Sequence, residues 1–101
     1  MLFRSCSYGG DKGIFGYGYS NLSMTNLVSN SGVVGSDVTG VGTGRRSPGA
    51  CEYGADKGIF GYGSTASKVS MTNLVSNSGV VSSDVTGVGT GRSYLTACSY
   101  N

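Results

Sequence analysis

"DKGIFGYG" occurs at Asp11–Gly18 and again, unchanged, at Asp56–Gly63. A longer shared stretch follows each copy: "SMTNLVSNSGVVGSDVTGVGTGR" spans Ser23–Arg45, and Ser70–Arg92 differs from it at a single position. The chain of 101 residues is therefore a tandem duplication. Its fold is set by what one unit forms and by how two such units pack, as in other repeat architectures.

A Cys-x-Tyr pattern frames both units, at Cys6–Tyr8, Cys51–Tyr53 and Cys98–Tyr100. The second copy of the unit is longer than the first between Gly63 and Ser70, where "STASKV" replaces "YSNL". We interpret this insertion as a change of loop length, because exposed loops tolerate insertion best. These boundaries predict a partial repeat strand at 1–8, a first repeat at 9–52, a second repeat at 53–97 and the start of a third at 98–101.

The composition favours a folded chain that is poor in core material. Glycine accounts for 19 residues and proline for one, whereas charged residues make up only 12% of the chain. Disordered segments of similar glycine content usually carry more charge and fewer β-forming residues. Leu, Ile, Val and Phe together make up about a fifth of the sequence, near the low end for a globular core. We therefore expect one chain to bury too little apolar surface on its own.

The local pattern predicts an all-β fold. "ACEYG" and "GIFGYG" flank Ala55–Lys57, which is the signature of a hairpin. In the first copy, strict alternation would place Phe15 and Tyr17 on one face and Ile14 and Gly16 on the other. "SMTNLVSN" also alternates, "SGVV" predicts a further short strand, and the glycine-rich "TGVGTGR" is expected to cross to the next unit. Each unit should hold three or four short strands in meander order, with no helix.

Two such units are too few for a finished repeat fold. A single meander leaves both faces in need of cover, and repeat folds generally need at least about three units. Because the units are almost identical, other copies of the chain are the natural partners. We expect a homo-oligomer that closes a ring, with a homo-trimer of six blades favoured and a homo-tetramer of eight second. The main alternative is an open β-solenoid or fibre.

The order of elements resembles the kelch class of β-propeller blade over nearly the whole chain. In "GRSYLTACSY" an arginine precedes a strand of small and apolar residues, and in the repeat a hairpin turn and the glycine-ended strand "GIFGYG" follow such a strand. The family's double glycine corresponds here to Gly61–Gly63, and its tryptophan is missing. The repeats are also loosely similar to those of phage and environmental viral proteins of tail-fibre type. The kelch resemblance implies a propeller built from two blades per chain and used mainly for binding.

The third Cys-x-Tyr copy is surplus to two blades. Strand exchange would let Arg92–Asn101 complete the blade of a neighbouring chain and displace its Met1–Tyr8, or the reverse. Otherwise one terminus is simply frayed. Because Met1–Arg4 matches the repeat poorly, we expect the N-terminal copy to be the loose one.

The sequence offers little for catalysis. Histidine is absent, which removes the usual general base and the commonest metal ligand. Asp11 recurs as Asp56, and exact duplication favours a structural role in each unit. Neither "TGVGTGR" nor "SYGGDKG" matches a phosphate-binding loop. We expect no enzyme, no cofactor and no metal.

The candidate functional residues fall into three sets. The first set would form salt bridges between blades or hold an anion in a central channel: Arg45, Arg92, Asp37 and Asp84, with Arg46 beside them. The second set would form one ligand pocket per blade, suited to stacking and hydrogen bonding of a sugar: Tyr17, Tyr62, Asn26 and Asn73. The third set would pack between blades: Cys6, Cys51, Cys98, Phe15 and Phe60. The cysteines occupy equivalent strands and are expected to be reduced.

The expected partner is the chain itself, with a glycan second. A net charge of +2 is too weak for a nucleic-acid footprint, and no apolar run of 18 residues predicts a membrane span. "MLFRSCSYGG" lacks the apolar region of a secretory signal. The location is left open, and the expected reduced cysteines indicate a soluble protein made in the cytoplasm, or a virion protein. We therefore expect a structural or binding module that self-assembles into a β-propeller; the alternative is a carbohydrate-binding propeller or the receptor-binding part of a viral particle.

Overall fold

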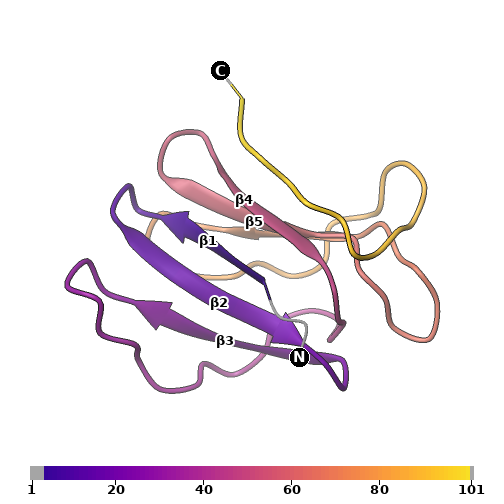
Figure 1. Cartoon of the computed structure of the whole chain (residues 1–101), viewed down its shortest axis with the longest axis horizontal. Helices are drawn as coiled ribbons and strands as arrows, with labels where there is room; N and C mark the ends of the chain where they lie inside the picture. Colours follow the sequence, from indigo (N-terminus) through magenta and orange to yellow (C-terminus); the bar gives the residue numbers. More distant parts are fainter. Residues whose placement is uncertain (1–3, 101) are drawn as a thin grey trace.

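The computed structural model describes residues 4–100, which form an all-β fold of two antiparallel sheets without a helix (Figure 1). Each sheet has three strands in meander order, β1-β2-β3 and β4-β5-β6. The strands are β1 Arg4–Tyr8, β2 Lys12–Gly18, β3 Leu22–Val28, β4 Gly49–Tyr53, β5 Lys57–Gly61 and β6 Thr72–Val75. Each sheet therefore joins a Cys-x-Tyr strand to the next two strands of the chain, so that β4, at the end of the predicted repeat 9–52, belongs to the second sheet. From here on, the first and second repeat mean the two sheets, each with the loop that follows it. The two sheets do not close a ring among these residues.

The predicted hairpin forms in both repeats with the same register. Cys6 faces Ile14 across β1 and β2, and Cys51 faces Ile59 across β4 and β5. The turn between β4 and β5 places Gly54 and Ala55 at positive φ, 60° and 75°. Glycine adopts such φ values without steric cost, which explains the glycine at this point of both repeats.

The alternation predicted for "GIFGYG" is wrong at its end. The pairing of β2 with β3 shifts register between Gly16 and Gly18, and Tyr17 between them has a positive φ of 62°. This bulge turns the Tyr17 ring to the side on which Gly16 faces the second sheet. Phe15 and Tyr17 therefore lie on opposite faces of β2, because a bulge breaks the period of two. Tyr62 repeats the positive φ, at 64°.

The segment "SGVV" does not form a strand in either repeat. It makes only isolated bridges back to the third strand of its own sheet, Val28 with Val34 in the first repeat and Val75 with Val81 in the second. Each described repeat thus has three strands followed by a long glycine-rich loop.

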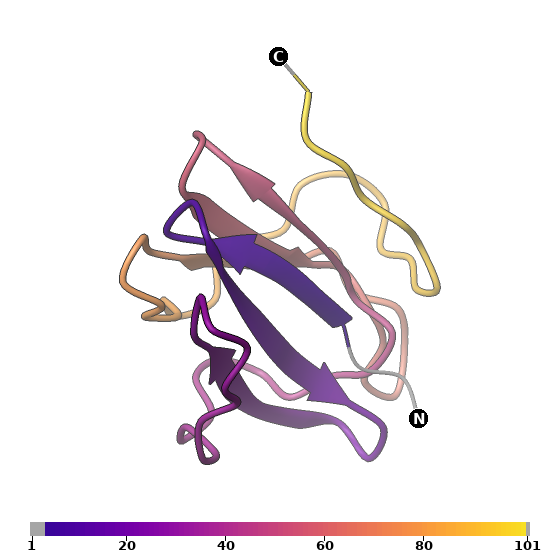
Figure 2. The ribbon, with the colours of Figure 1, turned by 60° about the vertical axis from the view of Figure 1, so that its left-hand side comes forward.

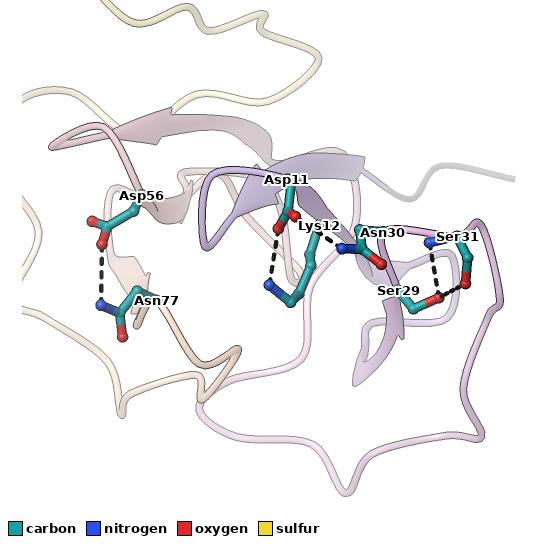
Figure 3. A network of polar contacts seen from close by, with 7 residues as sticks. All are labelled: Asp11, Lys12, Ser29, Asn30, Ser31, Asp56 and Asn77. Atoms are coloured by element: carbon teal, nitrogen blue, oxygen red, sulfur yellow. Dashed lines mark hydrogen bonds and ion pairs between the residues drawn. The ribbon is translucent and has the colours of Figure 1, made fainter.

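A polar contact ties the hairpin turn of each repeat to that loop (Figure 3). Asn30 donates to the carboxylate of Asp11 at 3.0 Å, and Asn77 donates to Asp56 at 3.0 Å. The pKa of Asp11 is lowered by the hydrogen bond from Lys12 and then by that from Asn30, and the pKa of Asp56 is lowered by those from Asn77 and Lys57. The duplicated aspartates therefore have the same structural role in both repeats.

The two sheets pack against one another, with β1 lying against β4 and β5 (Figure 2). Phe60 is fully buried and fills the space above Gly16, where an added Cβ atom would lie 2.8 Å from the phenylalanine ring. The core between the sheets consists of Tyr8, Ile14, Tyr17, Phe60, Val75 and Val81. This buried apolar cluster thus lies at the contact between the two repeats.

The third Cys-x-Tyr copy runs beside β4 on the side away from β1 (Figure 1). Its residues 96–100 are in no strand, and one backbone hydrogen bond, from the Tyr94 amide to the Ser47 carbonyl, joins the segment before it to the rest of the fold. The N-terminal copy, by contrast, pairs with β2 over its whole length. Within a single chain, the expectation of a loose N-terminal copy is therefore wrong, because β2 supplies an edge to β1 and no equivalent edge is present for the C-terminal segment.

Candidate assembly interface

The contact between the two repeats, here called the junction, joins two different faces. The front face is the side of the first repeat that contacts the second, and it includes Tyr17, Val41, Thr43 and Arg45. The back face is the side of the second repeat that contacts the first, and it includes Phe60, Asn73, Val81 and Asp84. Because the repeats have the same sequence, each also carries the other face. The second front face has Tyr62, Val88, Thr90 and Arg92; the first back face has Phe15, Asn26, Val34 and Asp37.

Arg45 stands at the centre of the junction. Its guanidinium lies 4.5 Å from the centroid of the Tyr17 ring, which in turn packs against Phe60 at 5.0 Å. Its Nε donates to the carbonyl of Tyr62 at 2.7 Å, and its Nη1 donates to the carbonyl of Thr43 at 3.0 Å. The side chain is fully buried, and this burial lowers the pKa of the Arg45 guanidinium. Cation–π stacking and charge-assisted hydrogen bonds offset only part of its desolvation. The pKa stays lowered, and the buried Nη2 has no hydrogen-bond partner among the described residues.

Asp84 closes the rim of the same junction. It accepts hydrogen bonds from the Thr43 amide at 3.1 Å and from the Thr43 hydroxyl at 2.6 Å, and it accepts a third from Asn73 at 2.9 Å. Desolvation raises the pKa of the Asp84 carboxyl, but these hydrogen bonds outweigh it and leave the pKa below the usual range. Ser7 also donates to Glu52 across the junction.

The predicted arginines and aspartates all lie on these faces, but they do not bond one another. Among the described side chains of residues 5–100, the ion pairs are those of Lys12 with Asp11 and of Lys57 with Asp56. Arg45 instead bonds carbonyl oxygens and Asp84 bonds a threonine. Asp37 accepts from Asn26 at 2.8 Å.

Arg92 and Asp37 make the same contacts within their own repeats as Arg45 and Asp84 make within theirs. Within the described chain they lack the contacts that Arg45 and Asp84 make with the other repeat. Arg92 stacks on Tyr62 at 4.2 Å and donates to the Thr90 carbonyl at 3.1 Å, just as Arg45 does with its own repeat. Its side chain is nevertheless exposed. Both halves of the junction are therefore preformed at the outer faces of the described chain.

The four residues predicted to form ligand pockets do not line equivalent open pockets in the two repeats. Tyr17 and Asn73 are buried, and the Tyr62 hydroxyl donates to the Val88 carbonyl at 2.9 Å. Tyr17 and Asn26 do line one cavity of about 270 Å³ on the first back face, together with Phe15, Gly16, Leu22, Met24 and Val34. The wall of this cavity is almost entirely apolar, which suits an apolar side chain better than a sugar. Glycan binding stays a prediction.

The three cysteines follow the stacking of the repeats. Cys6 and Cys51 are half-buried free thiols, Cys98 is an exposed one, and all three line the same shallow groove. Burial raises the pKa of the Cys6 thiol to about 11 and raises that of Cys51 as well. No group of three metal-binding side chains occurs within residues 4–100. Cys6 and Cys51 are therefore small packing groups whose thiols stay protonated at neutral pH.

Sequence reasoning missed the threonines and valines of the junction. Thr43 and Val41 come from the glycine-rich loop, which carries no strand pattern, so only their recurrence as Thr90 and Val88 marks them. Across the part of the chain that is described, no helix has the length and apolar character to cross a membrane. Comparison with known proteins finds no matching family model, no matching curated protein and no matching solved structure.

Proposed function

We propose that this chain is a non-catalytic structural module that self-assembles by stacking the repeats of successive copies. The observation that carries the proposal is that equivalent residues of the two repeats differ in their exposure to solvent. Val81 is 8% exposed on the second back face, whereas its counterpart Val34 is 55% exposed on the first. Phe60 is 0% exposed and Phe15 is 37% exposed. The same apolar face is thus covered in one repeat and open to solvent in the other.

Burial of this face supplies the driving force for assembly. Each fully buried Val or Phe side chain contributes about 1.5–3 kcal/mol relative to its exposed state. The open face also includes Leu22 and Met24, which are both exposed. A contiguous apolar patch of this kind is typical of an interaction surface. A second copy is the partner that the chain itself specifies, because its own first repeat already covers that face in its second repeat.

We further propose that the stack closes into a ring of kelch-like blades, with three chains favoured and four second. Closed rotational symmetry leaves no open end on which polymers can grow. Two features support a propeller: a three-stranded antiparallel meander in each repeat, and repeats that pack through their sheets.

Light scattering coupled to size exclusion over a hundredfold range of concentration tests the proposal. A single species of three or four chains is the expected result. A mass that grows steadily with concentration would contradict the closed ring and leave an open stack. A monomer throughout the range would overturn self-assembly itself.

A further inference from the structure

The second front face exposes the residues that the first front face buries. Val88 is 78% exposed, whereas its counterpart Val41 packs against the core of the junction beside Val81. Arg92 is also exposed, whereas Arg45 is fully buried. Thr90 is exposed as Thr43 is, at the rim of its face. The C-terminal segment contacts the part of this face nearest β4. It leaves the side with Val88 open.

The two open faces have nearly the same residues as the two faces that already meet in the junction, with Leu22 of the open back face in the place of Val69. Within the repeated stretches they differ only at Gly35 and Ser82. That difference preserves the local geometry, because the carbonyl of either residue accepts from the asparagine of its own repeat, at 3.2 Å from Asn26 and 3.1 Å from Asn73. The C-terminal segment covers the part of the second front face nearest β4 and must move aside for such a contact. Elsewhere on the two open faces, no added charge or larger side chain opposes a contact like the internal one.

We infer that the second front face of one copy receives the first back face of another in the register of the internal junction. This inference rests on the proposed function and specifies its contact. Arg92 Nε then donates to the Tyr17 carbonyl of the next copy, as Arg45 donates to that of Tyr62. Thr90 donates to Asp37, as Thr43 donates to Asp84. Val88 lies against Val34 of the next copy at the apolar cavity. The contact is head-to-tail, since it joins two different faces.

A pair of variants isolates each side of this contact. Val34→Asp places a carboxylate on the back face only, and Val88→Asp places one on the front face only. Both valines are exposed in a single chain, so the fold should tolerate the change, which circular dichroism and thermal unfolding at dilute concentration verify. Val33→Asp is the matched control. Val33 is 64% exposed and its counterpart Val80 is 63% exposed, so neither is covered in the internal junction.

Each variant alone should associate at least about tenfold more weakly than the wild type, because a carboxylate would be buried without a partner. Val33→Asp should assemble as the wild type does. An equimolar mixture of Val34→Asp and Val88→Asp should form a 1:1 complex. In this complex the intact front face of Val34→Asp meets the intact back face of Val88→Asp. The two outer faces both have a substituted residue, so no further chain can add. Analytical ultracentrifugation reads the masses and the dissociation constants.

The outcomes separate this inference from the proposed function. If the wild type is monomeric, the proposal of self-assembly is overturned, and so is the inferred contact. If the wild type assembles and both variants assemble equally well, the inferred contact is overturned while self-assembly stands. Weakening by one variant alone would indicate a contact between two like faces and would also overturn the head-to-tail register. An equimolar mixture of the two variants that stays dissociated would overturn this register as well.

Discussion

At the scale of single residues, the duplication places the same side chain in two environments. Arg45 and Arg92 each stack on a tyrosine and bond the carbonyl two residues back. Only Arg45 also reaches the next repeat, through the Tyr62 carbonyl. The two arginines make the same contacts within their own repeats. A difference between the effects of substituting them therefore gives the contribution of Arg45 to the junction.

The first prediction compares alanine substitutions at these two positions. Arg45→Ala should lower the free energy of unfolding by about 2 kcal/mol or more, because it removes a buried charge-assisted hydrogen bond and a cation–π contact. Arg92→Ala should change it by less than about 0.5 kcal/mol, as an exposed residue does. Urea denaturation of the two variants at a concentration where the chain is monomeric gives both values. Equal losses would show that Arg45 stabilises its own repeat and not the junction.

The second prediction concerns acid. The folded-state pKa of Asp84 is lowered below its ordinary value of 3.8. Its contribution to stability is therefore complete above the unfolded pKa and is lost as the pH falls below 3.8. Asp84→Asn should remove this part of the pH dependence and leave that of Asp11 and Asp56 unchanged. Because Asp84 lies at an exposed rim, we expect a difference of about 1 kcal/mol or less at neutral pH.

Urea denaturation of wild type and Asp84→Asn at pH 7 and at pH 3 provides the check. The two proteins should differ at pH 7, and the difference should narrow at pH 3, because pH 3 lies below the unfolded pKa of the Asp84 carboxyl. A gap that stays constant with pH would mean that the carboxylate charge has no part in the junction.

At the scale of the strands, the central glycines decide how closely the sheets approach. Gly16 in β2 and Gly61 in β5 share one local neighbour, a threonine methyl that would lie 3.1 Å from an added Cβ atom. Gly16 alone also faces a phenylalanine ring at 2.8 Å from that position. A side chain at Gly16 would therefore force the sheets apart.

Gly16→Ala should be more destabilising than Gly61→Ala by about 1–3 kcal/mol, the usual cost of overpacking a core. Thermal unfolding of dilute samples would show the difference as a lower midpoint for Gly16→Ala. If the two variants unfold at the same temperature, close packing of Phe60 on Gly16 does not hold the sheets together. In concentrated samples Gly61→Ala should also weaken assembly, because Gly61 would face Phe15 of the next copy.

The sequence predicted the hairpins because their signal is local. Turn residues and alternation identify β1–β2 and β4–β5 without knowledge of the rest of the fold. The bulge at Tyr17 was missed because a tyrosine at positive φ has no sequence pattern of its own. Tyr62 has a similar φ without a counterpart of Phe60 among the described residues, so the contact common to both tyrosines is the arginine stacked on the ring. "SGVV" has the composition of a strand, but no further strand lies beside it in one chain to complete the pairing. The junction residues of the glycine-rich loop were recognisable only through their repetition.

The C-terminal segment occupies the position that the first strand of the next copy would take. It lies beside Cys51 and Glu52 of β4, as β4 lies beside β1. Removal of residues 94–101 should therefore strengthen assembly, since the segment is held by few hydrogen bonds and competes for the site. Sedimentation of the shortened and full chains would show a lower dissociation constant for the shortened one. Weaker assembly would instead indicate that the segment is donated to the neighbouring copy.

At the scale of the whole molecule, the chain behaves as a short section of a one-dimensional array. Its stability is approximately the sum of the repeats' own stabilities and of the junctions between them. Two repeats have one internal junction, whereas four repeats joined in sequence have three. Since a lone three-stranded meander is only marginally stable, most of the stability must come from the junctions.

The last prediction uses this array directly. Residues 1–100 followed at once by residues 9–101 make a chain in which Cys98–Tyr100 replaces the first strand of the second copy and the spacing of the repeat continues. If successive copies meet as the internal repeats do, this chain should unfold cooperatively at a higher urea concentration than the single chain, because each added repeat brings a new junction. Two separate transitions, or a midpoint equal to that of the single chain, would show that the faces do not join. Val34→Asp in the first copy changes an outer face and should leave the midpoint unchanged, whereas the same substitution in the second copy enters the new junction and should lower it.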